Sequence, residues 1–218
     1  MRGARARACL TWLLLGLALG LGGCGTFAPD RPAKPRATAV RPPTSTGEAC
    51  YEALTARGVA FVPMPQLAAA GACSIPDGVR VQHLKTTLGK PVSLSCPTAV
   101  IVDRWVEEIV QPAARRHLGQ RVATVHHVGG FACRHRRDGN LSEHAAGRAI
   151  DIWGFDFDDG QRALIRDHWR GAGARSAFLQ DVGRRSCTIF HGVIGPGGDR
   201  DHHDHLHLDL GAWRLCTP

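Results

Sequence analysis

Two stretches of this chain combine histidine with aspartate: SEHAAGRAID at residues 142–151 and HHDHLHLDL at residues 202–210. In the first, Asp151 follows His144 by seven residues, and the second holds four histidines. Together they supply two histidines and a carboxylate, the donor set of a catalytic zinc site whose fourth position stays open for water. A further histidine beside such a site could move protons. The two stretches therefore predict a zinc hydrolase.

The same stretches predict two strands of a sheet. In the second stretch leucines alternate with polar residues, Leu206 and Leu208 with His205, His207 and Asp209. In a strand, this period of two places the histidines on one face and the leucines on the other. Residues 147–152 (GRAIDI) also have the pattern of a strand, entered through a small-residue turn. Asp151 would then lie on a sheet face, with His144 just before the start of the strand.

The remaining elements show no regular alternation of strand and helix. Apolar residues at helical spacing predict the longest helix at 98–118, ended by Gly119 and kinked or restarted at Pro112. We expect shorter helices at 50–58 and 176–182, and an irregular segment with short strands at 61–94. Strands are expected at 121–128, 149–155, 163–166, 187–194 and 206–210. The predicted fold class is α+β: a single domain with a largely antiparallel sheet of about five strands, flanked by helices.

The N-terminus has the composition of an export signal. Three arginines precede an apolar run at residues 10–21 that is too short to span a bilayer comfortably, and small residues then lead to Cys24. This pattern resembles a bacterial lipoprotein signal peptide over residues 1–23, which implies a lipid on Cys24. The alternative is an ordinary secretory signal with a chance cysteine. Gly25, where inner-membrane lipoproteins carry Asp, favours the outer membrane, with the protein facing the periplasm.

Residues 24–48 are rich in proline and basic residues and hold little that could be buried, so we expect an extended, solvated tether. This matters for the formal net charge of +8. Of the 27 Lys and Arg and 19 Asp and Glu, seven and two precede residue 50, which leaves 20 against 17 and a net charge of +3. With no Lys/Arg-rich helix and no aromatic platform either, the folded part is not expected to bind nucleic acid.

Six cysteines remain once Cys9 and Cys24 are set aside: Cys50, Cys73, Cys96, Cys133, Cys187 and Cys216. An even number in an exported protein predicts three disulfides, with about 15 pairings open. We expect a local bridge from Cys50 to Cys73 that staples an N-terminal subdomain at residues 50–95. For the catalytic domain at residues 96–218, the expected pairs are Cys133 with Cys187 and Cys96 with Cys216.

Three segments resemble the bacterial extensin-like C-terminal domain family: residues 129–134 (GGFACR), 142–151 and 202–209. More distantly, His-x6-Asp followed by His-x-His is similar to zinc peptidases typified by D-Ala-D-Ala dipeptidases, murein endopeptidases and the hedgehog signalling domain. The resemblance implies a fold of that type and a zinc ion. It also implies roles for five residues: His144, Asp151 and His207 as zinc ligands, His205 as catalytic base, and His202 as a further active-site histidine.

One departure concerns the base. The D-Ala-D-Ala branch has Glu three residues before its last ligand, where this chain has Asp204. His205 would instead take the proton of water and return it to the leaving amine. Arg134, after a glycine turn, could clamp a terminal carboxylate or an oxyanion, or be an ordinary surface arginine. Glu143 and Asp209 could orient imidazoles, or be a turn residue and an ion-pair partner.

Three functions remain open from the sequence. The first is a membrane-anchored zinc peptidase that cleaves stem or crossbridge peptides of peptidoglycan, with D,D- and L,D-bonds both possible. The second is a zinc-containing module that binds cell-wall peptides without cleaving them, because a fold does not fix a function. The third is a surface metal-buffering tract at residues 202–205. The distant His144 and Asp151 argue against this third function, since a chelating tract needs no such partners.

Overall fold

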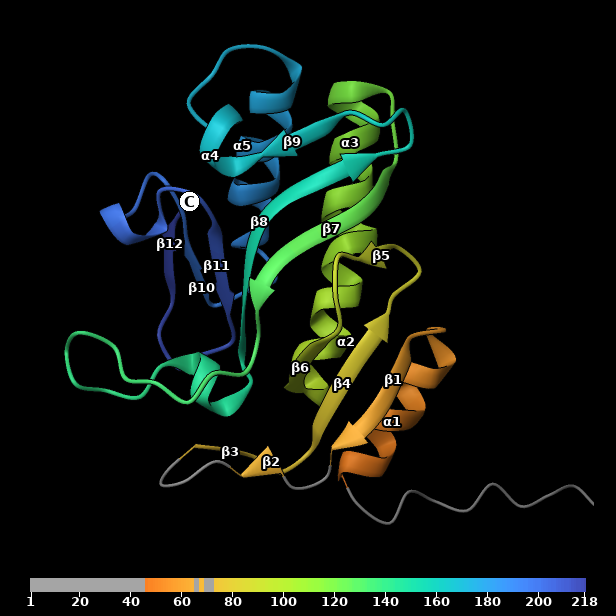
Figure 1. The fold of residues 1–218 in the computed structure, drawn as a ribbon, viewed down its shortest axis with the longest axis vertical. Helices are drawn as coiled ribbons and strands as arrows, with labels where there is room; N and C mark the ends of the chain where they lie inside the picture. Colours follow the sequence, from red (N-terminus) through yellow and green to blue (C-terminus); the bar gives the residue numbers. More distant parts are fainter. Residues whose placement is uncertain (1–45, 65–66, 69–72) are drawn as a thin grey trace, which may run out of the picture. The chain divides into compact units, whose positions relative to one another are not determined.

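A computed structural model describes residues 46–64, 67–68 and 73–218 (Figure 1). The predicted signal peptide, the lipid site at Cys24 and nearly all of the tether lie outside the described residues. The described part belongs to one compact unit of the chain. None of its helices is long and apolar enough to cross a membrane.

The larger sheet has seven strands in the order β12-β10-β11-β8-β7-β5, with β9 also paired to β8. Its strands are β5 (Thr87–Leu88), β7 (Val122–Gly129), β8 (Ala149–Phe157), β9 (Arg162–Leu164), β10 (Gly192–Ile194), β11 (Leu206–Asp209) and β12 (Leu215–Thr217). All pairs are antiparallel except β5 with β7 and β10 with β12. The predicted α+β class and largely antiparallel sheet are therefore confirmed, and the five expected strands gain two short edge strands.

A second sheet lies in the segment where we expected irregular structure with short strands. It is antiparallel, with β1 (Ala60–Met64), β4 (Gly78–His83) and β6 (Val92–Ser95) in the order β1-β4-β6. A further pair is formed by β2 (Leu67–Ala68) and β3 (Ser74–Ile75). The prolines are compatible with these strands because Pro63 lies in the edge strand β1 and Pro91 directly precedes β6.

The predicted helix at 98–118 is present in three consecutive parts: α2 (Cys96–Trp105), the π-helical turn η1 (Val106–Val110) and α3 (Gln111–Leu118). Pro112 has no backbone N–H and cannot continue the α-helical pattern of hydrogen bonds. Just before it, the Gln111 N–H donates to the Val106 carbonyl, five residues back. Gly119, at φ 65°, ends the helix as predicted. The chain's irregularity at Pro112 is thus a widened turn within one long helix.

The other helices are α1 (Thr46–Ala56), η2 (Glu143–Ala146), α4 (Ile165–His168), α5 (Ala174–Ser186) and η3 (Arg200–His202). Helix α5 is longer than the predicted 176–182, and the strand expected at 187–194 is correspondingly shorter. At its last residue, the buried Ser186 Oγ donates to the Val182 carbonyl and accepts from the Trp105 indole, which ties the end of α5 to the long helix. Turn residues then lead into β10 at Gly192.

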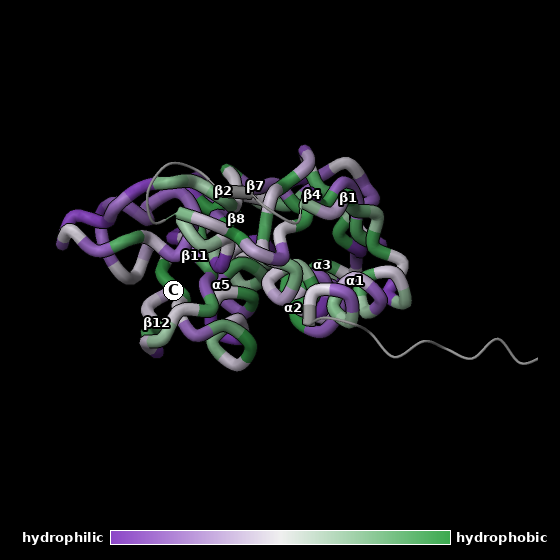
Figure 2. Tube along the Cα trace, turned by 90° about the horizontal axis from the view of Figure 1, so that it is seen from below, coloured by the Kyte–Doolittle hydropathy of each residue, from purple (hydrophilic) through white to green (hydrophobic). Residues whose placement is uncertain are grey.

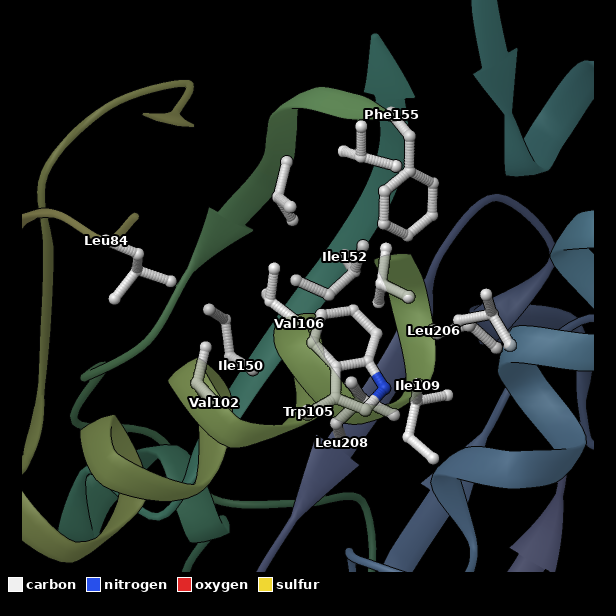
Figure 3. Packing of buried hydrophobic residues seen from close by; sticks show 14 of the residues in the cluster. Leu84, Val102, Trp105, Val106, Ile109, Ile150, Ile152, Phe155, Leu206 and Leu208 are labelled. Atoms are coloured by element: carbon white, nitrogen blue, oxygen red, sulfur yellow. The ribbon is translucent and has the colours of Figure 1, made fainter. Parts of the chain in front are cut away.

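The two faces of β8 and β11 have different characters. Ile152 pairs with Leu206 and Ile150 with Leu208, and all four are fully buried on the face covered by the long helix. Figure 3 shows them around Trp105, Val106 and Ile109 of that helix. Because successive strand residues point to opposite faces, Asp151 and His207 lie on the other face. Figure 2, which colours the chain by hydropathy, shows hydrophobic and hydrophilic stretches along the tube.

The six cysteines form three disulfides, as expected, but every predicted pairing is wrong. The bridges are Cys50–Cys96, Cys73–Cys133 and Cys187–Cys216. Cys96 begins α2, which packs on α1, and this brings it to Cys50. Cys216 lies in β12 beside β10, close to the end of α5, where Cys187 follows. The expected staple from Cys50 to Cys73 is not formed, so no bridge is internal to residues 50–95.

We expect peptide mapping of the oxidised mature protein to find these three pairs and thiol titration in denaturant to find no free thiol. Replacing Cys73 and Cys133 together by serine should lower the free energy of unfolding by about 2–4 kcal/mol, because the unfolded chain loses a constraint. Thermal or denaturant unfolding measures this. Several reactive cysteines in the unreduced wild type would contradict both the pairing and the export argument.

Candidate functional site

Three elements bring His144, Asp151 and His207 together. His144 lies in η2, Asp151 in β8 and His207 in β11, where the register of the two strands sets His207 directly opposite Asp151. All three side chains are buried, and one donor atom from each lies within 4.8 Å of the others. His144 Nε2 is 3.2 Å from both Asp151 Oδ1 and His207 Nδ1, and His207 Nδ1 is 2.9 Å from Asp151 Oδ1.

Each imidazole of the cluster is oriented by an outer hydrogen bond, made by the ring nitrogen that points away from Asp151. His144 Nδ1 is hydrogen-bonded to the Gly130 carbonyl, and His207 Nε2 lies 3.0 Å from Asp209 Oδ2. Both outer partners are acceptors, so we assign the ring protons to these two nitrogens. If a metal ion displaces the remaining ring protons, the lone pairs of His144 Nε2 and His207 Nδ1 would face it beside Asp151. Such outer partners are a regular feature of metal-binding histidines.

Two glycines allow the close packing around these outer hydrogen-bond partners. A Cβ atom at Gly130 would collide with the Ser93 carbonyl, and one at Gly192 would collide with the Asp209 carboxylate. Asp209 is further fixed by its Oδ1, which accepts a hydrogen bond of 2.7 Å from the Gly211 N–H. The role proposed for Asp209 from the sequence, orienting an imidazole, therefore has a geometric basis.

The charges of the cluster favour a cation. Burial by itself would raise the pKa of Asp151, but hydrogen bonds and charge from His144 and His207 outweigh burial and hold this pKa well below its usual range. Burial would likewise lower the pKa of His207, but its bonds to Asp151 and Asp209 outweigh that and raise it to about 9. The cluster thus stabilises positive charge between two carboxylates, as a metal site must.

In each of two further histidines, one ring nitrogen lies within hydrogen-bonding distance of a carboxylate. His205 Nδ1 lies 2.8 Å from Asp204 Oδ1, and its Nε2 lies 3.9 Å from Asp151 Oδ1. His202 Nδ1 lies 2.7 Å from Asp199 Oδ1, and the His202 ring is centred 5.0 Å from that of His205. Neither residue belongs to the predicted strand, because β11 begins at Leu206 and His202 ends η3. Both rings nevertheless border the cluster.

The six residues given catalytic or metal-binding roles from the sequence line one pocket of about 910 Å³: Arg134, His144, Asp151, His202, His205 and His207. Arg134 is 57% exposed, and its Nη2 lies 3.8 Å from Asp151 Oδ2, so its guanidinium is available at the rim. Cys133, directly before it, is held by the bridge to Cys73. The pocket therefore joins a buried donor cluster to an exposed cation.

Of the two roles left open for Glu143, the structure favours that of a turn residue, and the sequence analysis was incomplete about two aspartates. Glu143 contacts Arg148, with Oε2 2.7 Å from Nε, and reaches no imidazole. Asp199 was not singled out, although an acidic residue three positions before His202 is a spacing that a short helix brings together. Asp204 was noted only as a departure from the Glu-containing branch, and its bond to His205 was not foreseen.

Comparison with known proteins adds a family to this geometry. A family model described as extensin-like protein C-terminus matches residues 48–217. The chain belongs to this family. The match of the extensin-like C-terminal family covers both sheets and all residues of the cluster, and confirms the first resemblance seen in the sequence. No curated protein and no protein of known structure matches the chain.

Proposed function

We propose that the protein is a zinc-dependent peptidase that acts on peptidoglycan peptides. The observation that carries the proposal is the cluster of His144, Asp151 and His207, whose donor atoms lie within 4.8 Å of one another and whose imidazoles are aimed by Gly130 and Asp209. Two histidines and one carboxylate form the ligand set of many catalytic zinc sites. We also propose that the protein is distantly similar to D-Ala-D-Ala dipeptidases and murein endopeptidases.

The ion and one histidine would share the chemistry. A bound zinc ion would polarise the scissile carbonyl and make water acidic enough to ionise near neutral pH. His205 is the residue that would move protons, since Asp204 holds its Nδ1 and leaves Nε2 directed toward the cluster. It would accept the proton of the attacking water and deliver it to the leaving amine. Asp204 would thus act as a positioning residue.

Two other residues would handle the substrate. The Arg134 guanidinium keeps its charge at all working pH values and projects at the rim, where it would bind a peptide carboxylate or the developing oxyanion. The His202 ring, centred 5.7 Å from that of His207 and oriented by Asp199, would donate a hydrogen bond to the substrate beside His205.

The proposed substrate follows from the proposed location. A lipid on Cys24 and a proline-rich tether would hold the domain close to the bacterial cell wall, facing the periplasm. Stem or crossbridge peptides of peptidoglycan would be within reach there. The modest net charge of the folded part gives no reason to add a nucleic-acid partner.

A second candidate is a zinc-containing module that binds cell-wall peptides without hydrolysis. It is favoured by one observation: Asp204 stands where the D-Ala-D-Ala branch has its Glu base, and its carboxylate is engaged by His205. Digestion of purified muropeptides with and without chelator, followed by mass analysis, separates the candidates. New products that depend on the metal support the peptidase, whereas intact muropeptides with every wall type offered support the binder.

The orienting role of Asp209 gives a prediction with a matched control. Asp209→Asn should weaken zinc binding about 10–100-fold, because His207 loses a charged acceptor that fixes its ring. Glu143→Gln changes another acidic residue of the same pocket that contacts Arg148 and no imidazole, so zinc affinity should stay near that of the wild type. Competition with a chromophoric chelator measures both. Equal affinities for the two variants would contradict the assignment.

A further inference from the structure

A second hollow, of about 250 Å³, adjoins the site. Its apolar walls are Val128, Trp153 and Leu164, and its polar walls are Arg166, Asp204 and His205. Val128 and His205 also line the larger pocket, so the two spaces adjoin at these side chains. Trp153 follows Asp151 by two residues in β8, which places both on the same face of the sheet.

A β-bulge exposes one of the apolar walls. Between β7 and β8, His127 pairs with Ile152 and Gly129 pairs with Asp151, so Val128 is an extra residue without a partner of its own. Bulges redirect side chains and are frequent beside active sites. Here the bulge leaves Val128 56% exposed, an unusual degree for a valine in a sheet that is otherwise well buried. Val128 lies two residues before Gly130, whose carbonyl orients His144.

Other contacts make the hollow a fixed structure. The Trp153 ring stacks on His126 with 4.6 Å between ring centroids, and His126 Nε2 lies 2.8 Å from Asp156 Oδ2. Leu164 is the last residue of β9, which pairs with β8 and places it opposite Gly154. The apolar walls therefore come from three adjacent strands and one of them is held by ring stacking.

The charged groups of the hollow are already engaged. Arg166 Nε lies 2.8 Å from Asp167 Oδ1, and Asp204 Oδ1 lies 2.8 Å from His205 Nδ1. A charged ligand side chain would have to compete with these pairs, whereas an apolar one would only cover the three apolar walls. An apolar cavity of about 150 Å³ is large enough to hold benzene. The hollow can thus admit an apolar side chain as large as leucine.

We propose that this hollow is a specificity subsite that receives an apolar side chain next to the peptide bond held at the metal cluster. The proposal rests on the proposed action on peptides, and extends it by naming the kind of residue selected. A peptide that crosses the larger pocket passes Val128 and His205, and its neighbouring side chain would enter between Trp153 and Leu164. Burial of each added carbon there favours binding, and a charged side chain gains nothing.

The test uses the zinc-loaded mature protein and blocked tetrapeptides, Gly-X-Ala-Gly and Gly-Ala-X-Gly, in which X is glycine, leucine or glutamate in either stereochemistry. Isothermal titration calorimetry measures binding, and mass analysis of the same mixtures measures cleavage. We expect at least one series in which leucine binds about tenfold or more tightly than glycine, since one methylene in an apolar pocket is worth about 10-fold or more. Glutamate should bind no more tightly than glycine.

Variants locate the effect. Trp153→Ala should reduce the preference for leucine to about threefold or less, because it loses most of the apolar wall. Leu164→Ala, with a smaller loss from another wall, provides the test if circular dichroism shows that Trp153→Ala does not fold. Trp213→Ala is the control, since Trp213 is 82% exposed and lines neither space, and it should keep the wild-type preference.

The outcomes separate this proposal from the peptidase. Absence of a leucine preference in every series, or of any peptide binding, would overturn the subsite, as would a folded Trp153→Ala variant that keeps the preference. If muropeptides are cleaved but no preference exists, the subsite alone fails. If leucine is preferred, Trp153→Ala abolishes the preference and no peptide or muropeptide is cleaved, the subsite stands and the peptidase fails.

Discussion

We expect the wild-type protein to hold about one zinc ion per chain, and substitution of His207 by alanine to abolish this binding. His207 supplies one of three protein donors, and its loss leaves Asp151 and His144 with two, too few for a tetrahedral site with an open position. His144→Ala should have the same effect. Inductively coupled plasma mass spectrometry after dialysis measures zinc content, and circular dichroism verifies folding.

His203→Ala is the matched control. His203 belongs to the same histidine tract but is 63% exposed and does not line the pocket. It should leave zinc content unchanged. Zinc should also stabilise the wild type, by about 2.7 kcal/mol at a free concentration 100 times the Kd, so chelation should lower the Tm of the wild type and not that of His207→Ala. Full zinc retention in both His144→Ala and His207→Ala would reject the site, and loss in His203→Ala would favour a surface chelating tract.

The alternation in the sequence was sufficient to predict the two central strands of the site. Leu206 and Leu208 alternate with His207 and Asp209, and a strand with one buried face has this period whatever its neighbours are. The pairing of His207 with Asp151 could not be derived from alternation, because it depends on the register between strands whose paired residues are 56 positions apart in the chain. The sequence analysis placed the two residues in one site only through the similarity to zinc peptidases that it expected.

The disulfides show the opposite case. Sequence spacing favoured a bridge between Cys50 and Cys73. In the structure, β6 is followed directly by α2, and α2 packs on α1. Cys96 at the start of α2 therefore lies beside Cys50 of α1. Short strands were expected in this segment, but not the sheet that they form, because Pro63 lowers the strand signal and only its position on an edge strand makes it tolerable. Both errors come from contacts between segments, which no local pattern encodes.

The histidine that we propose to move protons gives the second large effect. His205→Ala is expected to keep zinc and fold but to lose about 10²–10⁴-fold in the rate of muropeptide hydrolysis. The physical reason is its position: His205 Nε2 lies 3.9 Å from Asp151 Oδ1, whereas His207 Nδ1 lies 2.9 Å from the same oxygen. His205 is thus outside the group of three donors, and from its place beside them it would act on water rather than hold the ion.

Three measurements on each variant decide this assignment: zinc content, kcat/KM on muropeptides, and peptide affinity. His203→Ala again serves as the control, because it removes an exposed imidazole two residues from His205 and should leave all three unchanged. Loss of zinc in His205→Ala would make His205 a ligand and not a base. A binding module predicts different results, since His205→Ala would then leave peptide affinity nearly unchanged while the wild type itself releases no product. A wild type with stoichiometric zinc that cleaves no muropeptide would therefore replace the peptidase by the binder, whatever His205→Ala shows.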